Sequence, residues 1–249
     1  MLPRAVTFDF GETLATLDAE LLVTKLARLG ATASSARIVA ALPDAWEIYQ
    51  RAGHPGSADS GGGRHPWKPL MAGLLAQASV PDPSRHGAFV DALFDDQPRA
   101  NLWRKPIPGM IELVRELAAH GVPVGVLSNS EGRLAELVAE LAWTRDLPVV
   151  IDSGRVGVAK PEPAIFRLAA DALGVAVGEL IHVGDSLRAD VMGALDAGAA
   201  ALWFTSPPAY PDATRTGPAG VPVCRNACET RAALFARLGL PVEENEVTS

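Results

Sequence analysis

Side chains that can act as a nucleophile, a base or a metal ligand follow short apolar segments at four places in the chain. The first is Asp9, which directly follows the apolar segment 5–8 and precedes Gly11 and Glu12. A short apolar segment without helical periodicity is typical of a buried strand. A carboxylate at the end of such a strand lies at the carboxyl edge of a sheet, where open α/β sheets bind ligands. The alternative is an Asp that caps a following helix.

The second place is the run Leu127-Ser128-Asn129-Ser130, which ends another apolar segment. Its hydroxyl and amide groups could cap a following helix, or could hold an anion beside the free N–H groups of that helix. The third place is Lys160, shortly before a helix that Pro161 or Pro163 can start. Most lysines are hydrated surface residues, so Lys160 alone indicates little.

The fourth place holds two carboxylates, Asp185 and Asp190, five residues apart. Asp185 ends an apolar segment, and Asp190 is expected about one turn inside the next helix. Carboxylates in this arrangement suit a hard cation such as Mg²⁺, which prefers oxygen ligands and keeps several waters.

Helical and extended patterns alternate from residue 106 onward. Strands are predicted at 122–127, 149–151, 180–183, 200–204 and, weakly, 221–223, and helices at 110–120, 163–173, 187–197 and 230–238. Alternation with short connections predicts an α/β fold, a doubly wound parallel Rossmann-like sheet with right-handed crossovers.

The segment 15–104 has helical periodicity and no convincing strand. Helices are predicted at 17–29, at 34–51 with an interruption near Pro43, at 67–78 and at 84–94. We therefore predict a core of residues 1–14 and 106–249, and a helical cap of residues 15–105 inserted after the first strand.

A Gly-rich stretch at 53–63 interrupts this helical segment and is typical of a mobile loop. His54, His65 and Trp67 flank the loop, and we expect them to be hydrated rather than to bind a substrate. Disorder is otherwise expected only after Pro241.

Composition excludes several classes of protein. The 249 residues are 48% hydrophobic with a net charge of -7 and no cluster of Lys and Arg, which argues against nucleic acid. The apolar runs are too short to cross a membrane, and Arg4 and Asp9 interrupt any signal-peptide core. Cys224 and Cys228 lack a second pair for zinc, so we expect reduced, inert thiols in a cytoplasmic protein.

Together the four places resemble the motifs of the haloacid dehalogenase (HAD) superfamily, in the same order along the chain. The resemblance covers residues 2–14 and 106–240, and a helical insertion directly after the first motif looks like the cap of subfamily I. It implies a phosphoryl-transfer site: Asp9 as nucleophile, Ser128 and Asn129 binding the phosphoryl group, Lys160 neutralising charge, and Mg²⁺ held by Asp9, the Gly11 carbonyl, Asp185 and Asp190.

The chain departs from that resemblance at Gly11. Phosphatases of this superfamily carry there a second Asp, which protonates the leaving oxygen. A glycine cannot do so, and general acid–base catalysis typically contributes about 10²–10⁴ in rate. The adjacent Glu12 is a weak candidate to substitute, because consecutive side chains usually point apart.

The resulting expectation is a Mg²⁺-dependent, phosphatase-like hydrolase for a small phosphorylated molecule, either weakly active or restricted to good leaving groups. A first alternative is a C–X hydrolase. 2-Haloacid dehalogenases also lack the second Asp but need no metal, and phosphonatases use a cap lysine, for which Lys25 and Lys68 are the candidates. A second alternative is a binding or regulatory protein that has lost turnover. The chain alone indicates neither the substrate nor the oligomeric state.

Overall fold

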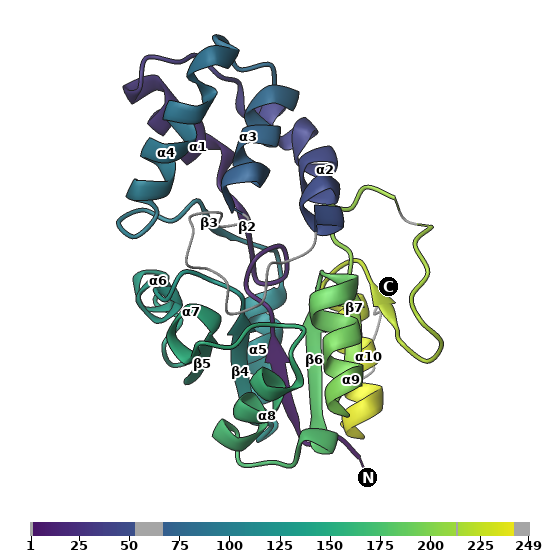
Figure 1. The fold of residues 1–249 in the computed structure, drawn as a ribbon. Helices are drawn as coiled ribbons and strands as arrows, with labels where there is room; N and C mark the ends of the chain where they lie inside the picture. Colours follow the sequence, from purple (N-terminus) through teal and green to yellow (C-terminus); the bar gives the residue numbers. More distant parts are fainter. Residues whose placement is uncertain (1, 53–66, 213, 242–249) are drawn as a thin grey trace, which may run out of the picture.

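The computed structural model describes residues 2–52, 67–212 and 214–241. The predicted loop at 53–63, with His54 and His65 at its edges, and the tail after Pro241 lie outside the described residues. Within them the chain forms a parallel sheet with helices on both faces, and a separate group of helices joined to it (Figure 1).

The sheet contains six parallel strands in the order β5-β4-β1-β6-β7-β8. Their bounds are β1 Ala5–Phe8, β4 Val124–Ser128, β5 Val149–Asp152, β6 Leu180–Gly184, β7 Ala200–Phe204 and β8 Val223–Cys224. The order reverses at β1, since the strands that follow it in the chain lie first on one side and then on the other. The predicted doubly wound α/β fold is therefore confirmed, and β1 is the central strand from which Asp9 leads out.

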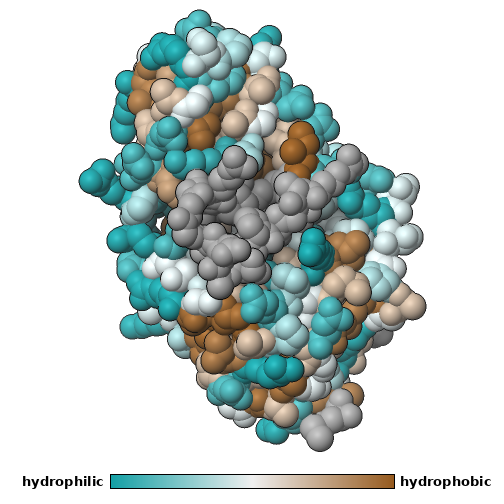
Figure 2. All heavy atoms as spheres, in the orientation of Figure 1, coloured by the Kyte–Doolittle hydropathy of each residue, from teal (hydrophilic) through white to brown (hydrophobic). Residues whose placement is uncertain are grey.

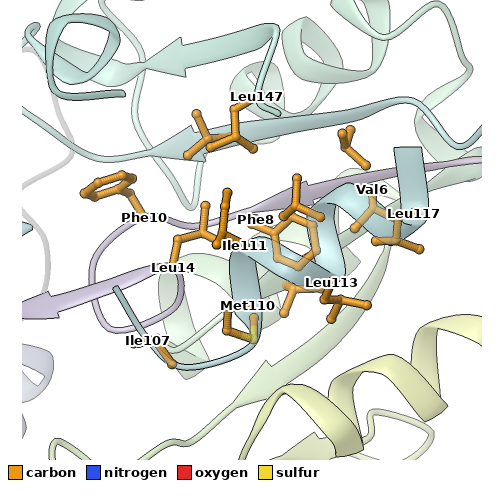
Figure 3. Packing of buried hydrophobic residues seen from close by; sticks show 14 of the residues in the cluster. Val6, Phe8, Phe10, Leu14, Ile107, Met110, Ile111, Leu113, Leu117 and Leu147 are labelled. Carbon is orange, nitrogen blue, oxygen red and sulfur yellow. The ribbon is translucent and has the colours of Figure 1, made fainter. Parts of the chain in front are cut away.

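Helices cover both faces because the strand side chains alternate between two hydrophobic clusters. One cluster contains Val6 and Phe8 of β1 and the buried side of α5. Figure 3 shows these side chains pointing toward one another. The opposite cluster contains Ala5 and residues of α8 and α9. The helices of this part are α5 Met110–Ala119, α6 Leu134–Glu140, α7 Ser153–Val156, α8 Pro163–Ala172, the π-helix η3 Leu187–Met192, α9 Gly193–Ala197 and α10 Ala227–Leu238.

A second group of helices, here called the helical unit, has a hydrophobic cluster of its own. It consists of α1 Ala19–Arg28, α2 Ser35–Ala52, α3 Trp67–Gln77 and α4 His86–Asp96. The predicted interruption of α2 near Pro43 is wrong: the helix runs through this residue. Proline removes one backbone hydrogen bond, but Leu42, Ala45 and Trp46 are buried around it and hold the helix in place.

Two short strands connect the helical unit to the sheet, although the sequence pattern predicts no strand between residues 15 and 104. β2 (Ala15–Leu17) and β3 (Trp103–Pro106) pair antiparallel, with a register shift between Thr16 and Leu17. The segment by which the chain leaves the core (β2) therefore lies beside the segment by which it returns (β3). Strands of three and four residues are too short to give a clear periodic pattern.

The surface carries scattered apolar residues. On the face shown in Figure 2, hydrophobic and hydrophilic residues are mixed over the coloured surface. Among the described residues, no helix is both long enough and apolar enough to span a bilayer. Both cysteines are free thiols, and burial raises the pKa of Cys224 to about 11.

Candidate active site

Three candidate residues follow adjacent strands of the sheet. Asp9 follows β1, Ser128 ends β4, and Asp185 follows β6. The backbone N–H of Asp9 donates to the carbonyl of Val183 at 2.8 Å, which continues the β1–β6 pairing to the edge. All three side chains are buried and line one pocket, together with Gly11, Asn129, Lys160 and Asp190. The sequence-predicted site residues are therefore brought together.

Lys160 is the centre of the polar contacts in this pocket. Its ammonium donates to Asp9 Oδ1 at 2.7 Å, to Asp190 Oδ1 at 2.5 Å and to the carbonyl of Leu127 at 2.9 Å. The side chain is 2% exposed, so an unpaired charge there would be costly. Burial acts to lower the pKa of Lys160, but the charges of Asp190 and Asp9 outweigh it and raise the pKa. Lys160 is a cation shared by two carboxylates.

Asn129 fixes the backbone that carries Lys160. Its Nδ2 donates to the Lys160 carbonyl, and its Oδ1 accepts from the Lys160 N–H, both at 2.9 Å. This pair joins the end of β4 to the loop before α8. Asn129 thus places the ammonium as well as lining the pocket.

The interpretation of Ser128 and Asn129 as caps of a following helix is wrong. Helix α6 begins at Leu134, five residues after Asn129, and its N-cap residue Arg133 makes no side-chain cap. The N–H groups of Gly132 and Leu134 donate instead to the carboxylate of Asp152, at 3.1 and 2.9 Å. Asp152 was not predicted as a functional residue, although it is the last residue of β5 and Asp9 and Asp185 directly follow their strands.

Asp190 lies in the first turn of η3, close to the position predicted for it. Ser186 N donates to Asp190 Oδ2 at 2.8 Å, and the side chain folds back over Gly184. A Cβ on Gly184 would lie 2.3 Å from Asp190 Cγ, which explains why this position is a glycine. Burial acts to raise the pKa of Asp190, but Lys160 and His182 lower it, so the carboxylate is ionised.

His182 supports Asp190 from inside the sheet and was not found from the sequence. Its Nε2 lies 3.0 Å from Asp190 Oδ1, and its Nδ1 lies 2.9 Å from Thr7 Oγ1. Burial is the main cause that lowers the pKa of His182, so the ring is neutral. An ionised carboxylate only accepts, so Nε2 carries the hydrogen and Nδ1 accepts from Thr7.

Asp185 is 2% exposed and is bound by aromatic donors. Its Oδ2 accepts hydrogen bonds from Trp46 Nε1 at 2.8 Å and from the Tyr210 hydroxyl at 2.7 Å. Burial raises the pKa of Asp185 well above its usual value, and the charges of Asp190 and Asp9 add to this effect. A cation bound beside these carboxylates would favour the ionised form of Asp185 and so act against this rise in its pKa.

The three carboxylates fit a divalent cation. Asp9, Asp185 and Asp190 each offer an oxygen, and these atoms lie within 4.8 Å of one another. Oxygen donors of this hardness suit Mg²⁺. Both Asp190 oxygens already accept hydrogen bonds, from Lys160 and His182 and from the Ser186 N–H, so an ion bound by Asp190 would compete with these donors.

Gly11 and Glu12 lie where the first strand turns toward β2. Glu12 has a left-handed φ of 54° and is 2% exposed. Its carboxylate accepts from Thr16 Oγ1 at 2.8 and 3.0 Å and from Trp103 Nε1 at 3.1 Å. Burial raises the pKa of Glu12 to about 7. The side chain is thus engaged with the connecting strands, and it is not among the residues that line the pocket.

Aromatic residues form much of the pocket wall on the side of the helical unit. Trp46, Trp67 and Trp103 line the pocket and pack together, with the Trp46–Trp103 and Trp67–Trp103 ring centroids 6.2 and 6.3 Å apart. The expectation that Trp67 is hydrated is wrong: this first residue of α3 is 5% exposed. A tryptophan next to a Gly-rich stretch of sequence resembles a surface residue, because nothing local indicates that its ring packs on Phe94 of α4 and Trp103 of β3.

Neither candidate lysine of the helical unit is among the described residues of the pocket wall. Lys25 donates to Asp96 at 2.7 Å and to the carbonyl of Ala100 at 2.6 Å. Lys68 pairs with Asp91 at 2.7 Å. The structure therefore gives no support to a Schiff-base lysine of the phosphonatase kind.

The parallel sheet thus carries carboxylates after β1 and β6, and a buried lysine joins Asp9 to Asp190. Comparisons with known proteins identify the class of protein to which this arrangement belongs. The family model of haloacid dehalogenase-like hydrolases matches residues 3–198, so the chain belongs to that family. A phosphoserine phosphatase of Thermus thermophilus is 33% identical over 122 residues, which are 49% of this chain and 47% of that protein. The chain spans about half the length of the curated relatives it matches.

Solved structures extend the likeness over almost the whole chain. A HAD family hydrolase from Deinococcus radiodurans R1, with bound phosphate and sodium, has a TM-score of 0.61 and 25% identity, covering 94% of this chain and 96% of that one. A 2-haloacid dehalogenase from Pseudomonas syringae pv. Tomato DC3000 has a TM-score of 0.56 and 20% identity over 95% and 99% of the two chains. This second likeness shows the fold alone.

Proposed function

We propose that the protein is a Mg²⁺-dependent phosphatase that acts on a small phosphorylated molecule by transferring its phosphoryl group to Asp9. The observation that carries the proposal is the contact of the Lys160 ammonium with Asp9 Oδ1, in a pocket that also contains Ser128 and Asp185. The similarity to a named phosphoserine phosphatase and to a hydrolase with bound phosphate supports it.

The chemistry follows from the residues of the pocket. An oxygen of Asp9 forms a bond to phosphorus while the bond to the leaving oxygen breaks, and the electron pair stays with the leaving oxygen. Lys160 and Ser128 stabilise the charge on the equatorial oxygens. Bound Mg²⁺ supplies further positive charge for the phosphoryl oxygens. Water then attacks phosphorus of the acyl phosphate, releases phosphate and restores the Asp9 carboxylate.

The residue at position 11 limits which leaving groups can depart quickly. Gly11 offers no proton, and Glu12 is held by Thr16 and Trp103. The leaving oxygen therefore departs as an anion, which favours phenols and carboxylic acids over alkyl alcohols. The wall formed by Trp46, Trp67 and Trp103 favours an aromatic leaving group among these.

The helical unit acts as the cap in this proposal. Its residues close the pocket on the side away from the sheet, and β2 and β3 connect it to the core. A cap in this position excludes water from the reacting phosphorus and selects the substrate.

The proposal is tested by measuring phosphate release from a panel of acyl, aryl and sugar phosphates. With Mg²⁺ we expect aryl and acyl phosphates to turn over faster than sugar phosphates, and we expect a chelator to abolish release. Asp9→Asn is the control, because it retains shape but not the nucleophile. Equal release by the control would refute the proposal, as would metal-independent halide release from a 2-haloacid without any release of phosphate.

A further inference from the structure

Asp185 is held by donors from two distant segments. Trp46 belongs to α2, and Tyr210 lies in the segment that follows β7. Their distances to Asp185 Oδ2 are 2.8 and 2.7 Å, and Trp46 Nε1 also lies 3.0 Å from the Tyr210 oxygen. A third donor, Trp203 Nε1, binds the Asp185 carbonyl at 2.7 Å. Side chain and main chain of Asp185 are thus both fixed.

The proton count of this group is consistent. Tyr210 has one hydroxyl hydrogen and donates it to Asp185, whose Oδ2 lies 2.7 Å and whose carbonyl oxygen lies 3.0 Å from the hydroxyl. The single N–H of Trp46 is shared between Asp185 Oδ2 at 2.8 Å and the Tyr210 oxygen at 3.0 Å. Burial and the charge of Asp185 raise the pKa of Tyr210 well above its usual value, so the hydroxyl keeps its proton. Asp185 Oδ2 thus receives both donors, and these contacts fix the orientation of the carboxylate.

The same group joins the helical unit to the core. Trp46 is 7% exposed and packs against Trp103 in the hydrophobic cluster of the helical unit. Ala209 and Tyr210 belong to that cluster as well, although they follow a strand of the sheet. Figure 1 shows the end of α2 above the segment that leaves β7. The helical unit therefore reaches a candidate cation ligand directly.

We propose that Trp46 and Tyr210 are positioning residues that orient Asp185 toward the cation, so that cation binding and docking of the helical unit stabilise each other. The inference rests on the Mg²⁺ site of the proposed function. Groups that orient a metal ligand typically change metal affinity by 10- to 100-fold when they are removed. Coupling is reciprocal, so the factor by which docking of the helical unit strengthens cation binding is also the factor by which a bound cation strengthens docking.

The first experiment measures Mg²⁺ affinity by titration calorimetry, with no substrate present. We expect Trp46→Phe and Tyr210→Phe each to weaken binding about tenfold or more. Trp143→Phe is the matched control, since Trp143 packs on Phe10 in the core cluster and is not among the described pocket residues; its affinity should equal that of the wild type. Circular dichroism and thermal unfolding establish that each variant is folded. If Trp46→Phe does not fold, Tyr210→Phe still tests the inference, because this substitution removes only one oxygen.

The second experiment measures amide hydrogen exchange with and without Mg²⁺. In the wild type we expect Mg²⁺ to slow exchange in α2, and in Trp46→Phe we expect this effect to vanish. Unchanged affinity in both variants, or binding of Mg²⁺ without slower exchange in α2, would overturn the inference and leave the proposed function intact. A wild type that binds no Mg²⁺ would instead refute the metal site of the proposed function.

Discussion

The Lys160 ammonium donates to Asp9 Oδ1 at 2.7 Å, although the two residues lie 151 positions apart in the sequence. The same ammonium also contacts Asp190, and the side chains of Lys160 and Asp190 are 2% and 1% exposed. Such a buried group is stable only because each charge has its partner. The proposed nucleophile is therefore part of a charge network that also supports the fold.

Replacing Lys160 by Met should lower stability and abolish turnover together. The variant leaves Asp9 and Asp190 buried without their cation, and breaking a buried pair in this way costs about 3–5 kcal/mol. Chemical denaturation measures this loss. Lys25→Met is the comparison: Lys25 is buried too, but its partner Asp96 has a side chain 41% exposed and can be hydrated, so the cost should be smaller. Equal stability of Lys160→Met and wild type would contradict the network.

Gly11→Asp should raise the hydrolysis of alkyl phosphates. A Cβ at this position would lie 3.5 Å from Trp103 Cδ1, an ordinary contact, so the side chain fits. The new carboxyl group can protonate the leaving oxygen, which is typically worth about 10²–10⁴ in rate. Aryl and acyl phosphates should gain little, because their leaving groups need no proton.

Gly11→Asn separates this acid effect from a change in packing. It has nearly the same size but no acidic proton, so its rate on alkyl phosphates should stay near that of the wild type. If kcat/KM for an alkyl phosphate is the same in Gly11→Asp and Gly11→Asn, then the absence of an acid at position 11 does not limit the rate of the wild type.

Glu12 should make stability depend on pH. Its pKa is raised from 4.5 to about 7 in the folded protein, so the folded state holds a proton that the unfolded state has lost between these values. Wild-type stability should therefore fall as pH rises from about 5 to 7.5, by up to roughly 3 kcal/mol at 1.36 kcal/mol per pKa unit. Glu12→Gln, measured by urea unfolding at both pH values, should lack this decline.

Glu20→Gln gives the reference for that measurement. Glu20 is exposed in the first turn of α1, so its substitution should leave the pH profile of the wild type unchanged. Parallel profiles for Glu12→Gln and the wild type would show that Glu12 has no raised pKa.

The sequence was sufficient to place residues at the strand ends. Asp9, Ser128 and Asp185 could be found because each follows a short apolar segment, and parallel strands bring their carboxyl ends to one edge. Lys160 was harder to place, since it lies in the loop between α7 and α8 rather than directly after a strand, and Asn129 holds this loop through contacts that only the tertiary structure shows. These residues also match family motifs, which fixes their expected roles before their contacts are known.

The supporting residues could not be predicted, for a physical reason. Trp46 and Tyr210 have the pattern of ordinary core aromatics, and nothing local indicates that their polar atoms meet Asp185. His182 lies inside a buried strand, where a histidine has no periodic signal. Asp152 binds N–H groups some twenty residues before it in the chain. Such contacts depend on the tertiary structure rather than on local sequence.

The most direct test of the account is to trap the phosphoryl group on the enzyme. The protein is mixed with Mg²⁺ and an aryl phosphate and then quenched with borohydride, which reduces an acyl phosphate to an alcohol, and the peptides are analysed by mass spectrometry. We expect residue 9 to appear as homoserine in the wild type and as unchanged Asn in Asp9→Asn. Steady phosphate release with Asp9 unmodified, or reduction at another residue, would contradict the assignment of Asp9 as the nucleophile.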